Sequence, residues 1–305
     1  MVVRLRLFLA STSMLALPTY ESLRNSKHEL LGLIIKEERP AGRGQETREN
    51  DLARTLKEDG VAVYRVRDHD DLRRLLSDFE VDVVIAISFG MLVKPDSLNL
   101  PKHGWINLHF SLLPKYRGAA PVQRAILAGE EVTGLSVFKL DEGMDTGPIF
   151  RSKKVSIAGR NAGEVLSSLS REGAGEIIAA LDLIADGKAP ISQSGEPSFA
   201  PKIQSSESRI DFADSSISIA QRVAAFAPTP GAWCEVQGRR IKIFSAEPTS
   251  DESEIPGICR SVDPLVVSCG RGALQIFEVQ EAGKRRMTSQ EWVRGARIEV
   301  GTKFS

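Results

Sequence analysis

Three polar side chains in the middle of the chain have the types and spacing of a catalytic group. Asn107 and His109 lie two residues apart in residues 105–110, where apolar and polar residues alternate, so on a strand both would leave the same face. Asp145 lies further on, in the glycine-rich turn DEGMDTG. An amide can donate to a developing oxyanion, an imidazole can exchange a proton near neutral pH, and a carboxylate can orient that imidazole. Residue types and spacing alone leave structural roles equally open, since Asp in a Gly-rich turn is common.

The elements around the trio predict how it is positioned. After the strand, the sequence SLLPKYRG at residues 111–118 is bracketed by Pro and Gly and predicts a loop. A helix is predicted at residues 119–128, with Pro121 tolerated in its first turn. A second strand at residues 133–140 leads into the turn that carries Asp145. The trio is therefore expected where strands end and loops begin.

The chain before the trio alternates strands and helices, as in the βαβ units of a parallel sheet. Strands are predicted at residues 2–10, 29–35, 61–66 and 82–88, and helices at 14–25, 50–59 and 68–78. The first βα turn, Ser11-Thr12-Ser13, contains no GxGxxG, and the chain has no GxxxxGK[ST], which argues against NAD and ATP chemistry.

A flat ligand is expected beside the strand at residues 82–88. Its run of β-branched residues predicts a strand buried on both faces, and ligands of parallel sheets bind beyond the carboxyl ends of the strands. The apolar loop at residues 89–92 is therefore a candidate wall for a heterocycle. The alternative is that Phe89 and Met91 are simply core residues.

The second half of the chain predicts a separate domain. A strand at residues 149–157 and a helix from the capping-box residue Asn161 to about residue 185 complete the first domain. Residues 190–208 are rich in Ser, Pro and Gln and predict a linker. A helix at 216–227 is followed by short strands at 233–236, 239–244, 257–261, 265–268 and 274–279, a pattern typical of a small barrel. The expected domains are 1–189 and 209–305, joined by 190–208.

Composition excludes several classes of function. The 305 residues carry 40 basic and 40 acidic side chains, so a nucleic-acid partner would have to be met by local basic patches. The three cysteines have no CxxC spacing, which argues for reduced thiols in a cytoplasmic protein and against a zinc site. No apolar run is long enough for a membrane span, and we expect no membrane partner and a monomer.

The string NLHFSLLPKYRGAAP at residues 107–121, followed by DEGMDTG at 141–147, closely resembles the signature of the 10-formyltetrahydrofolate-dependent formyltransferases. Within that superfamily the chain is most similar to the tRNA formyltransferases. The resemblance implies that Asn107, His109 and Asp145 are catalytic and that no metal is needed. Phe110 stands where Pro is common in the family, and Ser11-Thr12-Ser13 replaces the usual Gly-Thr-Pro.

The resemblance also implies the binding residues and the fold. We expect a Rossmann-like, mostly parallel α/β sheet domain followed by an OB-like β-barrel. The co-substrate 10-formyltetrahydrofolate would contact Phe89, Gly90, Met91, Leu92, Ser111, Leu112, Leu113, Pro114, Asp141 and Gly143. Initiator methionyl-tRNA would contact Arg39 and Arg43 of the RPAGRG loop and Lys202.

The expected reaction is formyl transfer from the folate to the α-amine of methionine on initiator tRNA. The alternative is a sibling enzyme with a sugar nucleotide or water as the acceptor. The RPAGRG loop and the C-terminal barrel favour tRNA over these acceptors. A tRNA-binding protein without catalysis is a further alternative, and it predicts a broken trio, whereas all three positions are filled.

Overall fold

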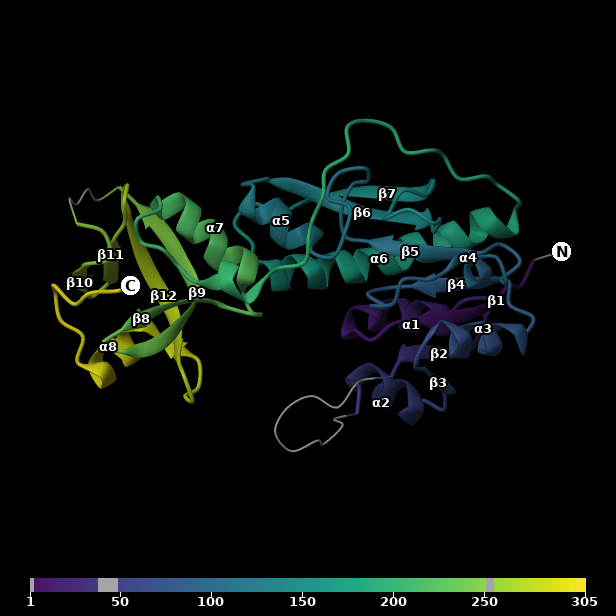
Figure 1. Cartoon of the computed structure of the whole chain (residues 1–305), viewed down its shortest axis with the longest axis horizontal. Coiled ribbons are helices and arrows are strands. Elements are labelled where there is room, and N and C mark those ends of the chain that lie inside the picture. Colours follow the sequence, from purple (N-terminus) through teal and green to yellow (C-terminus); the bar gives the residue numbers. More distant parts are fainter. Residues whose placement is uncertain (1–2, 38–48, 251–254) are drawn as a thin grey trace. The chain divides into compact units, whose positions relative to one another are not determined.

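The computed structural model describes residues 3–37, 49–250 and 255–305 (Figure 1). The chain divides into two compact units. Unit 1 comprises Met1–Gly118, Thr133–Val155 and Leu166–Phe199, and unit 2 comprises Ala119–Val132, Ser156–Val165 and Ala200–Ser305. The domain boundaries expected at residues 189 and 208 stay predictions.

Unit 1 is organised around a seven-stranded sheet with the order β3-β2-β1-β4-β5-β6-β7 (Figure 1). The strands are β1 (Arg6–Ala10), β2 (Glu29–Lys36), β3 (Val63–Val66), β4 (Val83–Ala86), β5 (Trp105–His109), β6 (Val132–Lys139) and β7 (Ile149–Ser156). β1 to β5 pair in parallel, and β6 runs antiparallel to β5. The predicted mostly parallel sheet is confirmed.

The strand order reverses direction between β1 and β4, which pair with each other. At such a switch point the loops after neighbouring strands diverge and leave a crevice at the carboxyl ends. Every residue of β4 is buried, as its β-branched sequence predicts. The loops that follow β1, β4 and β5 therefore open at one edge of the sheet, and these loops contain most of the predicted site.

The helices begin and end at local signals that the sequence carries. They are α1 (Leu17–Arg24), α2 (Asp51–Glu58), α3 (His69–Ser77), α4 (Pro95–Leu98), α5 (Pro121–Leu127), α6 (Ala162–Ala185), α7 (Ser216–Phe226) and α8 (Ser289–Ala296). The carboxylate of Asp68 accepts from the amides of Asp70 and Asp71, the expected N-cap of α3. Asn161 and Glu164 form the predicted capping box of α6.

The serines after β1 have a structural role that the sequence left unexplained. Ser13 caps the 3-10 turn Met14–Ala16 by accepting from the amide of Leu15 at 3.2 Å. The buried hydroxyl of Ser11 accepts from the amide of Ser13 at 3.1 Å and so shapes the same turn. Two hydroxyl groups therefore shape the start of the 3-10 turn.

Unit 2 contains an antiparallel six-stranded sheet with the order β10-β11-β12-β9-β8 and β13 paired with β12. Its strands are β8 (Ala232–Val236), β9 (Arg239–Thr249), β10 (Cys259–Val262), β11 (Leu265–Ser268), β12 (Ala273–Glu281) and β13 (Met287–Thr288). Residues 304 and 305 join the two sheet edges, since Ser305 pairs with Glu235 of β8 and Phe304 with Gly257, just before β10. The expected C-terminal domain of short strands, an OB-like barrel by resemblance, is confirmed as an antiparallel sheet domain.

Candidate active site

The end of β5 positions the amide and the imidazole of the predicted trio. His109 lies opposite Ser136 of β6, Asn107 lies opposite Phe138, and their spacing puts both side chains on one face of the sheet. The His109 ring is 6% exposed and stands edge-on to the Phe138 ring, with 6.3 Å between the ring centroids. Asn107 is half-buried. Its side-chain amide makes no hydrogen bond to any residue of the described ranges. It is therefore available to a ligand.

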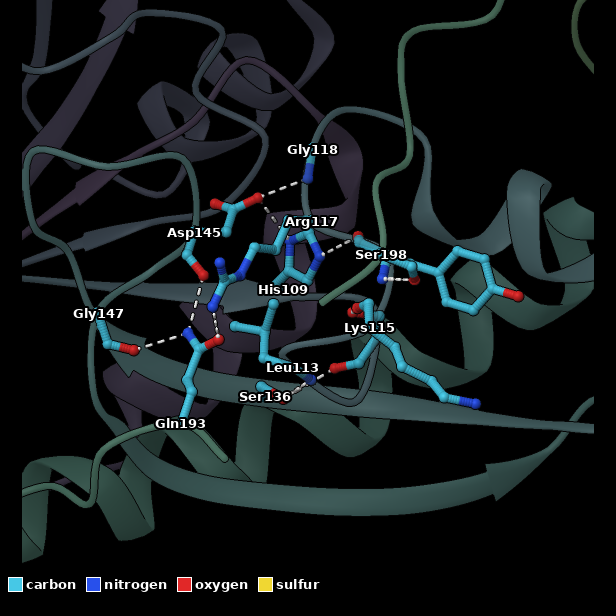
Figure 2. Close-up of polar contacts among 12 residues, drawn as sticks. His109, Leu113, Lys115, Arg117, Gly118, Ser136, Asp145, Gly147, Gln193 and Ser198 are labelled. Atoms are coloured by element: carbon cyan, nitrogen blue, oxygen red, sulfur yellow. Dashed lines mark hydrogen bonds and ion pairs between the residues drawn. The ribbon is translucent and has the colours of Figure 1, made fainter. Parts of the chain in front are cut away.

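The two nitrogen atoms of His109 face different partners (Figure 2). Nε2 lies 2.9 Å from the carbonyl oxygen of Tyr116, and Nδ1 lies 3.7 Å from Oδ2 of Asp145. A carbonyl oxygen only accepts, so Nε2 carries a proton and donates it. In the neutral ring Nδ1 then has a free lone pair beside the Asp145 carboxylate.

Burial lowers the pKa of His109 below its usual value, while the Asp145 carboxylate and the Tyr116 carbonyl act in the opposite direction. The imidazole is therefore neutral near pH 7, and Nδ1 can accept a proton. A proton gained there would form an ion pair with Asp145 over the existing 3.7 Å separation. The pair can thus take up a proton without moving.

Asp145 is fixed both by its own backbone conformation and by a bond to a neighbouring loop. Its φ of 52° lies in the left-handed region, which a non-glycine residue adopts at a cost. Its Oδ2 accepts the amide of Gly118 at 2.7 Å (Figure 2). A charge-assisted bond of this length holds the carboxylate toward His109.

Gln193 and Arg117 form a second layer behind Asp145 (Figure 2). The Gln193 amide donates to the carbonyl oxygens of Asp145 and Gly147, both at 2.8 Å, and accepts from Arg117 Nη2 at 2.6 Å. Sequence analysis missed Gln193 because it lies in a Ser- and Pro-rich stretch that resembles a linker. Nothing in its local sequence points to the site.

The loop after β5 is tied to β6 through one hydroxyl. Ser136 Oγ donates to the carbonyl of Ser111 at 2.8 Å and accepts the amide of Leu113 at 3.1 Å. Leu113 and Pro114 are buried and Leu112 is half-buried. The loop at residues 111–114, which is expected to contact the co-substrate, is therefore fixed against β6.

The loop after β4 turns its large side chains in different directions. Phe89 is buried against Trp105, with 6.1 Å between the ring centroids, and Met91 packs against the same core cluster. Gly90 and Leu92 are exposed. Phe89 and Met91 therefore have the positions of core residues, as the alternative interpretation predicts. A ligand beside this loop could contact its backbone and the Leu92 side chain.

Asp141 and Gly143 shape the turn that carries Asp145. Oδ1 of Asp141 accepts from the Gly143 amide at 3.0 Å and from the Thr146 hydroxyl at 2.6 Å. A side chain at position 143 would meet that hydroxyl at 2.0 Å, so only glycine fits. Both residues are exposed in the turn that carries Asp145, and their binding role stays a prediction.

Comparison with known proteins decides the family. The model described as "Formyl transferase" matches residues 4–180, and the model described as "Formyl transferase, C-terminal domain" matches residues 202–297. The chain belongs to the formyl transferase family. The predicted formyltransferase is confirmed.

Two relatives over nearly the whole chain share one name. "Methionyl-tRNA formyltransferase" of Salinispora arenicola (strain CNS-205) is 37% identical over 97% of this chain and 99% of its own length, and that of Rhizorhabdus wittichii is 37% identical over 99% and 98%. Among solved structures, the methionyl-tRNA formyltransferase from Clostridium thermocellum has a TM-score of 0.59 at 15% identity, over 89% of this chain and 98% of that chain. HypX from Aquifex aeolicus in complex with tetrahydrofolic acid has a TM-score of 0.70 at 17% identity, over 98% of this chain and 50% of that chain. These two likenesses show the shared fold.

Of the three cations expected to contact tRNA, the structure describes only one. Arg39 and Arg43 lie outside the described residues, and Lys202 is exposed.

Six basic side chains of the C-terminal domain have partners within unit 2. Lys284, Arg285 and Arg286 pair with Glu281, Glu291 and Glu278. Arg239 pairs with Glu281, Lys242 donates to the carbonyl of Pro230, and Arg240 stacks on Trp233. Arg239, Lys284, Arg285 and Arg286 therefore face carboxylates, whereas Lys242 and Arg240 contact uncharged groups.

Within residues 3–37, 49–250 and 255–305, no helix combines the length and the apolar character that crossing a bilayer demands. The same ranges contain no group of three or more His, Cys, Asp or Glu side chains arranged to hold a metal ion.

Proposed function

We propose that the chain transfers the formyl group of 10-formyltetrahydrofolate to the α-amine of methionine esterified to initiator tRNA. Relatives called methionyl-tRNA formyltransferase, aligned over nearly the whole chain, support the acceptor. The observation that carries the chemistry is the 3.7 Å approach of His109 Nδ1 to Asp145 Oδ2, with Asn107 on the same strand.

The site fits a formyl donor. When bound, 10-formyltetrahydrofolate supplies an activated formyl carbon. The Asn107 amide has no partner among the described residues, so it is free to donate to the formyl oxygen as negative charge develops there. Loss of one such donor typically costs ~10²–10³ in rate. The contact residues are expected to be Leu92, the backbone of Phe89, Gly90 and Met91, the loop Ser111, Leu112, Leu113 and Pro114, and Asp141 with Gly143.

His109 and Asp145 prepare the attacking amine. An α-amine is mostly protonated near neutral pH and must lose a proton before it can attack. Nδ1 of neutral His109 and Oδ2 of Asp145 are two proton acceptors 3.7 Å apart. The proton moves to Nδ1, and the resulting imidazolium stays beside the Asp145 carboxylate. The neutral amine then forms the new C–N bond to the formyl carbon. As the C–N bond to the folate breaks, His109 returns a proton to the departing nitrogen as general acid, and the second proton of the attacking nitrogen leaves to solvent.

The tRNA contacts are local ones. Since the formal net charge is zero, no global field draws in a polyanion. Arg39, Arg43 and Lys202 would meet phosphates at the acceptor end. A reaction on charged tRNA also supports a cytoplasmic location.

A comparison of acceptors tests the proposal. Purified protein would receive 10-formyltetrahydrofolate with methionyl initiator tRNA, with a dTDP-linked amino sugar, or with water alone. Formyl transfer to the charged tRNA, at least a hundredfold faster than to the other two acceptors, is expected. Faster formylation of the amino sugar, or folate hydrolysis that is unaffected by tRNA, would contradict the proposal.

A further inference from the structure

A segment far along the chain, residues 191–199, lies against the loops of the active site within unit 1. We call it the strap. It follows α6 as an extended stretch without a helix (Figure 1). Ile191 exchanges two backbone hydrogen bonds with Ile149, at 2.7 and 2.9 Å, which fix its start on β7. Its remaining polar contacts converge on the two loops that hold Asp145 and His109.

The Gln193 side chain makes the first set of contacts between the strap and the site. Its amide nitrogen donates to the carbonyls of Asp145 and Gly147, and its oxygen accepts from Arg117. Arg117 precedes Gly118, whose amide binds the Asp145 carboxylate. Asp145 is thus held at its backbone and at its side chain by one closed ring of contacts that passes through Gln193.

Ser198 makes the second set of contacts between the strap and the site. Its hydroxyl accepts the amide of Tyr116 at 2.9 Å, and its carbonyl accepts the amide of Arg117 at 2.8 Å. The carbonyl of Tyr116 is the group that orients Nε2 of His109. Ser198 therefore supports the imidazole side of the pair in the way that Gln193 supports the carboxylate side (Figure 2).

Two of the residues that the strap binds, Tyr116 and Asp145, have unfavourable backbone conformations. Tyr116 has a φ of 59° and Asp145 a φ of 52°. Left-handed conformations of non-glycine residues persist where surrounding contacts over-determine them. The strap supplies such contacts at both places, from side chains 48 and 82 residues away in the sequence.

We propose that the strap sets the catalytic geometry, with Gln193 and Ser198 as positioning residues that hold Asp145 and His109 in register for proton transfer. This inference rests on the proposed function. Gln193 and Ser198 need not touch substrate. Their loss should lower kcat with little change in KM, because substrate contacts remain while the acceptor pair loses its fixed separation.

The sharpest variant is Gln193→Glu, which keeps the size of the side chain and its acceptor for Arg117. It removes both donors and places carboxylate oxygen against two carbonyl oxygens. Ser192→Glu is the matched control, because it adds the same charge one residue away, at an exposed position. For each variant we would measure the melting temperature, kcat, KM for both substrates, and hydrogen exchange of the Gly118 amide.

In folded Gln193→Glu, a kcat at least tenfold lower, KM values within twofold of wild type and at least tenfold faster Gly118 exchange are expected, with Ser192→Glu unchanged. Unaltered Gly118 exchange, unaltered kcat, or equal effects in Ser192→Glu would overturn the inference. If Gln193→Glu does not fold, Ser198→Ala decides by the same criteria at the Tyr116 amide. A wild-type protein without formyl transfer would count against the proposed function, and the exchange measurements would then decide the strap by themselves.

Discussion

Replacing Asp145 with Asn tests the acceptor pair with the smallest change in shape. The amide oxygen can take the place of Oδ2 and keep the 2.7 Å bond to the Gly118 amide. The left-handed turn is tolerated by Asn as well as by Asp. What disappears is the negative charge 3.7 Å from His109 Nδ1. Any loss of activity therefore reports on that charge.

The size of the loss follows from the separation. Two unit charges at 3.7 Å attract by about 4 kcal/mol at an effective dielectric constant of about 20. Because the Asp145 side chain is 18% exposed, solvent screening reduces this figure, and we take about 2 kcal/mol as the lower limit. Stabilisation of the imidazolium by these amounts corresponds to a fall in kcat between about 30-fold and ~10³-fold.

The assay is single-turnover formyl transfer with both substrates saturating, so that it reports the chemical step. The control is Glu142→Gln, which removes a charge from an exposed position in the same turn. We expect the control to keep wild-type rates and Asp145→Asn to keep the wild-type melting temperature. A rate for Asp145→Asn within threefold of wild type would refute the role of the carboxylate.

Four other outcomes are expected. Asn107→Ala should lower kcat by ~10²–10³ while the protein still binds folate, and an unchanged kcat would remove Asn107 from the reaction. Arg43→Ala should raise KM for charged tRNA without affecting folate binding, which separate titrations would check. Asp68→Ala should lower the free energy of unfolding by about 1 kcal/mol through loss of the α3 cap, whereas Asp78→Ala at the other end of α3 should not, as urea denaturation would show. Burial lowers the pKa of three histidines below the usual value, namely His28, His103 and His109. The unfolded chain then binds more protons below about pH 6.5, so stability should fall as the pH drops through that value, and an unfolding free energy that is equal at pH 7.5 and 5.5 would contradict this.

Much of the fold could be predicted because its signals are local. The buried run of β4, the caps at Asp68 and Asn161, and the glycine-punctuated strands of unit 2 each act within a few residues. One local signal was missed. Thr288 and Glu291 form a capping box at the start of α8, and the apolar Trp292 and Val293 follow them, so the helix was readable from the sequence. The closing contact of Ser305 with Glu235 was not readable, since nothing in either sequence neighbourhood specifies the other.

The site divides in the same way. The predicted trio lies on one strand and one turn of unit 1, and the structure brings His109 and Asp145 together. The contacts that hold His109 and Asp145 come from residues whose partners are distant in sequence. Gln193 meets Arg117 across 76 residues, and Ser198 meets Tyr116 across 82. Such contacts depend on the folded arrangement of the loops, and a polar stretch after a helix gives no sign of them. The roles of the trio and of the folate-contact residues stay predictions until they are measured.

The central claim is that this site moves a formyl group onto the amine of methionyl-tRNA through His109. The most direct test is single-turnover conversion of radiolabelled methionyl initiator tRNA to formylmethionyl-tRNA with 10-formyltetrahydrofolate, by the wild type and by His109→Ala. The account predicts rapid product formation by the wild type and, in the variant, a rate at least a hundredfold lower with folate binding intact. No product from the wild type, or equal rates from both proteins, would contradict it.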